Sequence, residues 1–78
     1  MNYLIVEDFA GQAVCFLFPR RVDHADMREQ LPYAKVISAG FAELNNGEFL
    51  CSGGSHELGA NARPDEDAKI LTEALRPH

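Results

Sequence analysis

The sequence predicts a single small α+β domain over residues 1–78, with a four-stranded, mainly antiparallel sheet and two helices packed on one face of it. Two observations predict this fold. Two short apolar segments precede each of two helical patterns, which gives the element order ββαββα. Glycine-containing connections, at Gly11 and at Asn46-Gly47, join the two strands of each pair as hairpin loops do.

The first half of the chain predicts two strands and a short helix. Residues 2–8 (NYLIVED) and 13–18 (AVCFLF) are rich in branched and aromatic side chains, which are typical of strands. Pro19 ends the second strand because it has no N–H group to donate to a neighbouring strand. Asp23 is a preferred N-cap residue, so we expect the first helix over residues 23–31.

The second half repeats this order. Residues 34–44 (AKVISAGFAEL) predict a long strand, in which Gly40 indicates a bulge or a close backbone approach. Asn46-Gly47 favours a type I′ turn, because both residues tolerate a positive φ angle, and residues 48–52 (EFLCS) form the fourth strand. The second helix is expected to begin at Pro64, where a missing N–H group costs no hydrogen bond.

Composition excludes several classes of function. The net charge is −5, and the only run of adjacent basic residues is a pair, so we expect no nucleic-acid binding. The longest apolar run, AVCFLF, is far shorter than the ~20 residues of a membrane span. Met1 leads directly into a strand pattern without the features of a secretory leader. We therefore expect a soluble, acidic, cytoplasmic protein that does not bind membranes.

One loop gathers chemically capable side chains. Residues 51–59 (CSGGSHELG) contain a thiol, two hydroxyls, an imidazole and a carboxylate. The spacing matches neither a P-loop nor a dinucleotide-binding motif, so a structural connection is the simpler interpretation. The candidate ligand or partner residues in this loop are Ser52, Gly53, Gly54, Ser55 and His56.

Catalysis and metal binding find little support in the sequence. Cys51 and His56 would have to act as a thiol and its base, but Cys51 lies in a strand whose apolar neighbours make a thiol inert. The cysteines and histidines show none of the close spacings of zinc sites. We expect no catalytic residues, no metal and no cofactor.

Two arginines form a second candidate site. Arg20 and Arg21 stand just before the first helix, where positive charge opposes the helix dipole. A solvated basic corner is the simplest interpretation, and a corner that binds an anion or a partner protein is the alternative.

The first hairpin predicts self-association. Its strands do not alternate apolar and polar residues, so both faces are apolar, whereas two short helices cover one face. An exposed apolar face is rare in monomers, so we expect a homodimer through the open sheet face, with an unknown protein partner as the alternative. If instead a loop over residues 53–63 folds across this face, it covers the apolar surface, and neither a homodimer nor another partner protein is required.

Two functional hypotheses follow. The first is a non-catalytic protein-interaction or regulatory module that acts as a homodimer. The second is a small enzyme or ligand-binding protein that uses the Ser52–Gly59 loop, with Cys51 or His56 as its reactive group.

Overall fold

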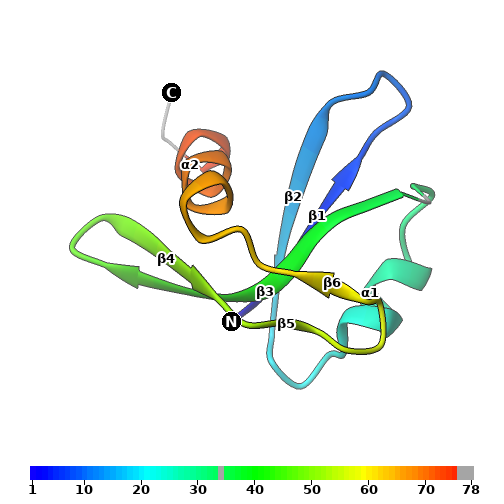
Figure 1. Ribbon diagram of the computed structural model, residues 1–78, viewed down its shortest axis with the longest axis horizontal. Coiled ribbons are helices and arrows are strands. Elements are labelled where there is room, and N and C mark those ends of the chain that lie inside the picture. Colours follow the sequence, from blue (N-terminus) through cyan, green and yellow to red (C-terminus); the bar gives the residue numbers. More distant parts are fainter. Residues whose placement is uncertain (34, 76–78) are drawn as a thin grey trace.

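Four strands form an antiparallel sheet in the order β2-β1-β3-β4, which places the N-terminal strand in the interior of the sheet (Figure 1). The computed structural model describes residues 1–33 and 35–75. The strands of this sheet are β1 (Asn2–Glu7), β2 (Ala13–Phe18), β3 (Lys35–Asn45) and β4 (Glu48–Ser52). The predicted α+β fold with a four-stranded antiparallel sheet is confirmed; Ala34, the first residue of the predicted third strand, lies outside the described residues.

Two helices and a second, smaller sheet complete the fold. The helices are α1 (His24–Glu29) and α2 (Pro64–Ala74). The small sheet, which the sequence did not predict, pairs β5 (Gly54–Ser55) with β6 (Ala60–Asn61). It is built from the loop between the fourth strand and the second helix, so this loop is an ordered hairpin.

The core lies on both faces of the sheet. Tyr3 and Ile5 of β1 point to one face, where they pack with Leu71 of α2. Leu4 and Val6 point to the other face. The residues that pack against this second face come from β2, α1 with its flanking segments, β3 and the small sheet: Val14, Phe16, Val22, Met27, Leu31, Tyr33, Val36, Leu58 and Ala60. Strand β1 is therefore covered on both sides.

The prediction that both helices pack on one face is wrong. Helix α2 belongs to the cluster around Tyr3 and Ile5, whereas Met27 of α1 belongs to the cluster around Leu4 and Val6. Because neighbouring strand residues point to opposite faces, the helices lie on opposite sides of the sheet. The small sheet adds Leu58 to the α1 side. The open apolar face on which a dimer was expected is thus covered by α1 and the loop.

Local backbone signals were read correctly in most places. Asn46 and Gly47 have φ angles of 53° and 81°, as the type I′ turn requires. Gly40 is a close approach and not the bulge, because the register of β1 and β3 shifts at Ile37, three residues before Gly40 and opposite Ile5 and Val6. Helix α2 begins at Pro64 as predicted, while Asp23 occupies the N-cap of α1 without a side-chain capping hydrogen bond.

Replacing Gly40 by alanine tests the close packing between β3 and the chain after β4. A Cβ atom at Gly40 would collide with the carbonyl oxygen of Ser52 and would crowd Ala62 and the ring of Tyr3. Overpacking of this kind costs about 1–3 kcal/mol, so Gly40→Ala should lower the free energy of unfolding in urea by that amount. Leu44→Ala, at an exposed position of the same strand, is the control and should change it little. Equal effects of the two substitutions would contradict this account of Gly40.

Candidate functional site

A buried carboxylate joins helix α2 to the middle of the sheet. The side chain of Asp67 is fully buried and accepts hydrogen bonds from the hydroxyls of Tyr3 (2.5 Å) and Ser38 (2.8 Å). Arg63 donates to the same carboxylate from its backbone N–H (2.8 Å) and from its guanidinium (3.0 and 3.2 Å). A buried charge is stable when it is paired and hydrogen-bonded in this way. The cluster anchors the first turn of α2.

Two weak acids beside this carboxylate are held in their neutral forms. Burial, followed by the hydrogen bond and the charge of Asp67, raises the pKa of the Tyr3 hydroxyl far above its usual value. Burial, followed by the charge of Asp67, raises the pKa of the Cys51 thiol. Because the thiolate is the reactive form of cysteine, Cys51 is in an environment that suppresses nucleophilic chemistry.

The loop that the sequence singled out forms an open hollow. Its volume is about 530 Å³, and it lies in the β5–β6 hairpin. The residues that line it are Gly54, Ser55, His56, Gly59 and Asn61. Three of the five predicted loop residues are therefore gathered here, while Ser52 ends β4 and Gly53, between β4 and β5, has a positive φ angle of 78°.

Cys51 and His56 lie in different environments. Cys51 packs with the cluster on the α2 side of the sheet, whereas His56 is exposed in the hairpin turn. Ser55 is buried, and its hydroxyl accepts a hydrogen bond from the N–H of Leu58 (3.3 Å). This bond and the packing of Leu58 against the α1-side cluster hold the hairpin closed. The geometry gives the loop a structural explanation that does not need a ligand.

The basic corner rests on an aromatic cluster. The guanidinium of Arg20 lies 4.9 Å from the centre of the Phe41 ring, a distance suited to a cation–π contact. The buried His24 ring packs edge-on against Phe18 and Phe41, and its Nε2 lies 3.0 Å from the carbonyl oxygen of Gly40. Because a carbonyl oxygen only accepts hydrogen bonds, Nε2 carries the proton. Arg20 is thus fixed at the corner, and the neighbouring Arg21 is exposed.

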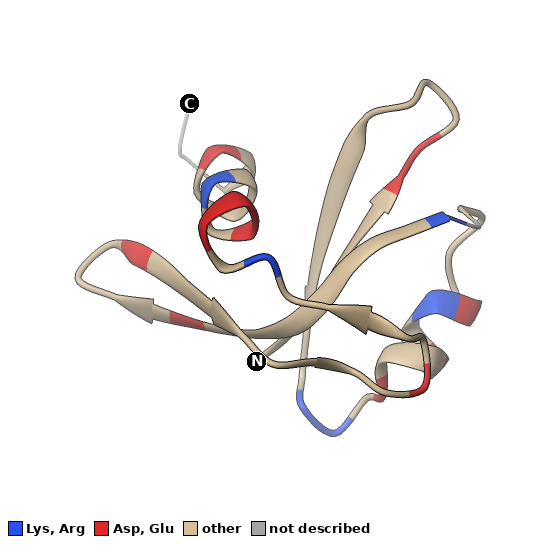
Figure 2. Ribbon diagram, viewed as in Figure 1, with Lys and Arg blue, Asp and Glu red and all other residues tan. Residues whose placement is uncertain are grey.

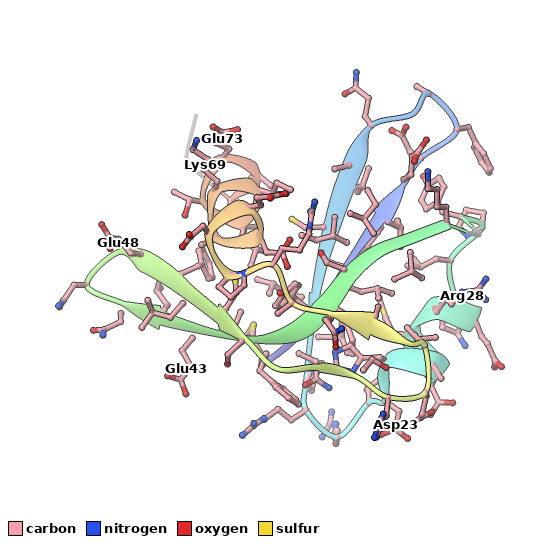
Figure 3. The ribbon with its side chains drawn as sticks, viewed as in Figure 1. Asp23, Arg28, Glu43, Glu48, Lys69 and Glu73 are labelled. Carbon is pink, nitrogen blue, oxygen red and sulfur yellow. The ribbon has the colours of Figure 1, made fainter. Side chains whose placement is uncertain are left out.

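The outer edge of β2 has no partner strand among the described residues. This edge strand is six residues long, and it contains neither a charged residue nor a proline. Four of its apolar side chains, in residues 14–17, are half-buried, and Ala13 is exposed. The opposite edge differs, because the shorter β4 carries the exposed Glu48 (Figure 3). Charges on an edge strand discourage pairing with another chain, so β2 is the unguarded edge.

Comparison with protein-family models, with curated proteins and with solved structures finds no significant match for this chain. Within residues 1–33 and 35–75, no helix is long and apolar enough to cross a membrane. In the same described part of the chain, no group of three or more metal-ligating side chains is placed to hold an ion. Function must therefore be argued from the surfaces described above.

Sequence reasoning missed the Asp67 cluster. A signal for it was present, because Asp67 stands one helical turn before Leu71 and thus continues the apolar stripe of α2 onto the sheet. It also missed that β2, an apolar strand without a charged residue, forms an edge of the sheet. That feature depends on the strand order, which places β2 at the edge.

The neutral Tyr3 hydroxyl predicts a loss of stability at high pH. Below the pKa of an unfolded tyrosine, about 10, both states are protonated. Above it only the unfolded state ionises, so the free energy of unfolding should fall by up to about 1.4 kcal/mol per pH unit through Tyr3. In a Tyr33→Phe background, Tyr3 is the sole tyrosine, and its absorbance change at high pH should coincide with loss of the far-UV circular dichroism signal. A tyrosinate signal from the folded domain would contradict the buried hydrogen bond.

Proposed function

We propose that this chain is a non-catalytic protein-interaction module that works as a homodimer, formed along the free edge of β2. The observation that carries the proposal is the composition of this edge: six apolar residues without a charge or proline. A strand edge presents unpaired N–H and C=O groups, which pair readily with a strand of another chain. Among the described residues, the backbone hydrogen bonds of turns and loops do not involve β2.

The size of the domain supports the same proposal. A chain of 78 residues buries only about 60–65% of the surface that its unfolded form exposes, so its stability is small. A partner strand along β2 would extend the sheet and would cover the half-exposed side chains in residues 14–17. A symmetric dimer is the commonest closed assembly of identical chains.

A second candidate is a ligand site in the loop hollow. The observation that favours it is the hollow itself, which exposes the His56 imidazole beside Ser55 and Asn61. Cys51 is not among its lining residues, so the hollow offers no thiol nucleophile. This candidate is therefore a binding site for a small polar molecule and not a catalytic centre.

The edge dimer predicts the mass of the protein in solution. Sedimentation equilibrium at micromolar concentration should give twice the mass of the chain. Leu17→Lys places a charge on the β2 edge and should weaken the dimer at least about tenfold, which corresponds to 1.4 kcal/mol. Leu50→Lys, the same substitution at an exposed position of the other edge strand, is the control and should leave the mass unchanged.

Circular dichroism shows whether Leu17→Lys still folds. If it does not, Ala13→Lys provides the second test, because Ala13 is exposed on the same strand and belongs to neither core cluster of the described residues. A monomeric mass for the unsubstituted chain would overturn the proposed function.

Thiol labelling tests the enzyme hypothesis, in which Cys51 is the reactive group. Burial and the charge of Asp67 raise the pKa of the Cys51 thiol. In an excess of a disulfide reagent, this thiol should therefore react only after the domain unfolds. The Cys15→Ser variant, in which Cys51 is the sole thiol, gives the cleanest measurement. Rapid labelling of Cys51 in the folded domain would contradict a buried, non-catalytic role and would favour the enzyme hypothesis.

A further inference from the structure

The hydrogen-bonding pattern of the first hairpin identifies which backbone groups of β2 face outward. The N–H of Asp8 donates to the carbonyl oxygen of Gln12 (2.8 Å), so this pair closes the ladder of the hairpin. In an antiparallel pair, hydrogen-bonded and non-hydrogen-bonded positions alternate. Residues 14, 16 and 18 therefore bond to β1. The N–H and C=O groups of Ala13, Cys15 and Leu17 point away from it, to the free edge.

Two copies of this edge fit each other best in one register. A twofold axis perpendicular to the sheet pairs two β2 strands antiparallel and keeps each side chain on its own face. If the axis passes through Cys15, then Ala13 lies opposite the partner's Leu17, and Val14 lies opposite the partner's Phe16. Each pair combines a smaller with a larger apolar side chain. The outward backbone groups of residues 13, 15 and 17 then all find partners.

The charges at the two ends of β2 are complementary in the same register. The basic corner, Arg20 and Arg21, follows β2, and the acidic end of the hairpin, Glu7 and Asp8, precedes it (Figure 2). Antiparallel pairing brings the basic end of one copy beside the acidic end of the other. Glu7 already pairs with Lys35 (2.9 Å), which leaves Asp8 as the acidic residue for the corner.

The hairpin turn packs against the segment that follows α1. Phe9 is 82% exposed, and the centre of its ring lies 5.1 Å from that of Tyr33. A six-residue edge is only about 20 Å long, and a stable interface buries about 800 Å² per partner. Contacts at both ends of the strand would enlarge the interface beyond the backbone pairing.

We infer that the partner of the β2 edge is a second copy of this chain, paired antiparallel about a twofold axis at Cys15, with Arg21 of the basic corner of each copy near the partner's Asp8. This inference rests on the proposed edge dimer and adds its register and its charged contacts. It gives the basic corner a protein partner.

Crosslinking at Cys15 tests the register. In the Cys51→Ser variant, the two Cys15 side chains share one face at a hydrogen-bonded pair, where Cα atoms lie about 5.5 Å apart. A short thiol crosslinker such as dibromobimane, applied at mildly alkaline pH because burial raises the pKa of Cys15, should give a covalent dimer. The matched control moves the thiol two residues along the same face, as Ala13→Cys with both native cysteines replaced by serine. It should crosslink at least tenfold more slowly.

The outcomes separate the register from the dimer itself. A dimeric mass with crosslinking faster at position 13 than at position 15 would overturn the register and leave the proposed edge dimer standing. A dimeric mass without a covalent product at either position would also overturn it. A monomeric mass would overturn both proposals.

Charge substitutions test the contact of the corner. Arg21→Glu should weaken the dimer at least fivefold and should reduce its sensitivity to salt, because it removes an attractive pair and adds a repulsive one. Asp8→Asn, which keeps the oxygen that accepts hydrogen bonds from the N–H groups of Ala10 and Gln12, should weaken it in the same direction. Lys69→Glu on α2 is the control and should have no effect. An Arg21→Glu dimer as tight as the unsubstituted one would overturn the assigned contact.

Discussion

The carboxylate of Asp67 is the interaction on which the arrangement of this domain depends. It is buried without exposure to solvent and is reached by donors from three separate parts of the chain: Tyr3 of β1, Ser38 of β3 and Arg63 before α2. Because an unpaired buried charge would be very unfavourable, these donors must meet at one point. The helix therefore begins at a fixed place over the two interior strands. Its apolar residues, Leu71 among them, then pack on the same face.

A second constraint comes from the position of β1. As an interior strand between β2 and β3, it has both faces covered, and its residues 3–6 are completely buried. The sequence contained this information, since NYLIV shows no alternation of apolar and polar residues. The absence of alternation in an interior strand indicates cover on both faces. With both helices expected on one side, this lack of alternation indicated an exposed face. The position of α1 on the other side depends on contacts between residues distant in sequence, such as Met27 and the β1 side chains.

The parts of the fold that sequence patterns predict well are those set by local chemistry. The Asn46-Gly47 turn, the start of α2 at Pro64 and the break at Pro19 depend on backbone preferences of single residues, and the structure has all three. The β5–β6 hairpin was missed because each of its strands has only two residues and no periodicity. For the candidate site, the sequence identified the loop that forms the hollow. It could not show that Cys51 and His56 point into different surroundings.

The two constraints together determine where the domain is able to interact. With Asp67 holding α2 on one face, and α1 and the small sheet on the other, both faces of the sheet at β1 are covered by the chain itself. The edges remain, and they are not equivalent, because Glu48 lies on β4 while β2 is free of charge (Figure 3). An uncharged edge strand can pair with strands of other chains in an uncontrolled way unless a defined partner occupies that edge. A second copy of the chain can be this partner, because the basic residues that follow β2 and the acidic residues that precede it lie at opposite ends of the strand and meet when two copies pair antiparallel.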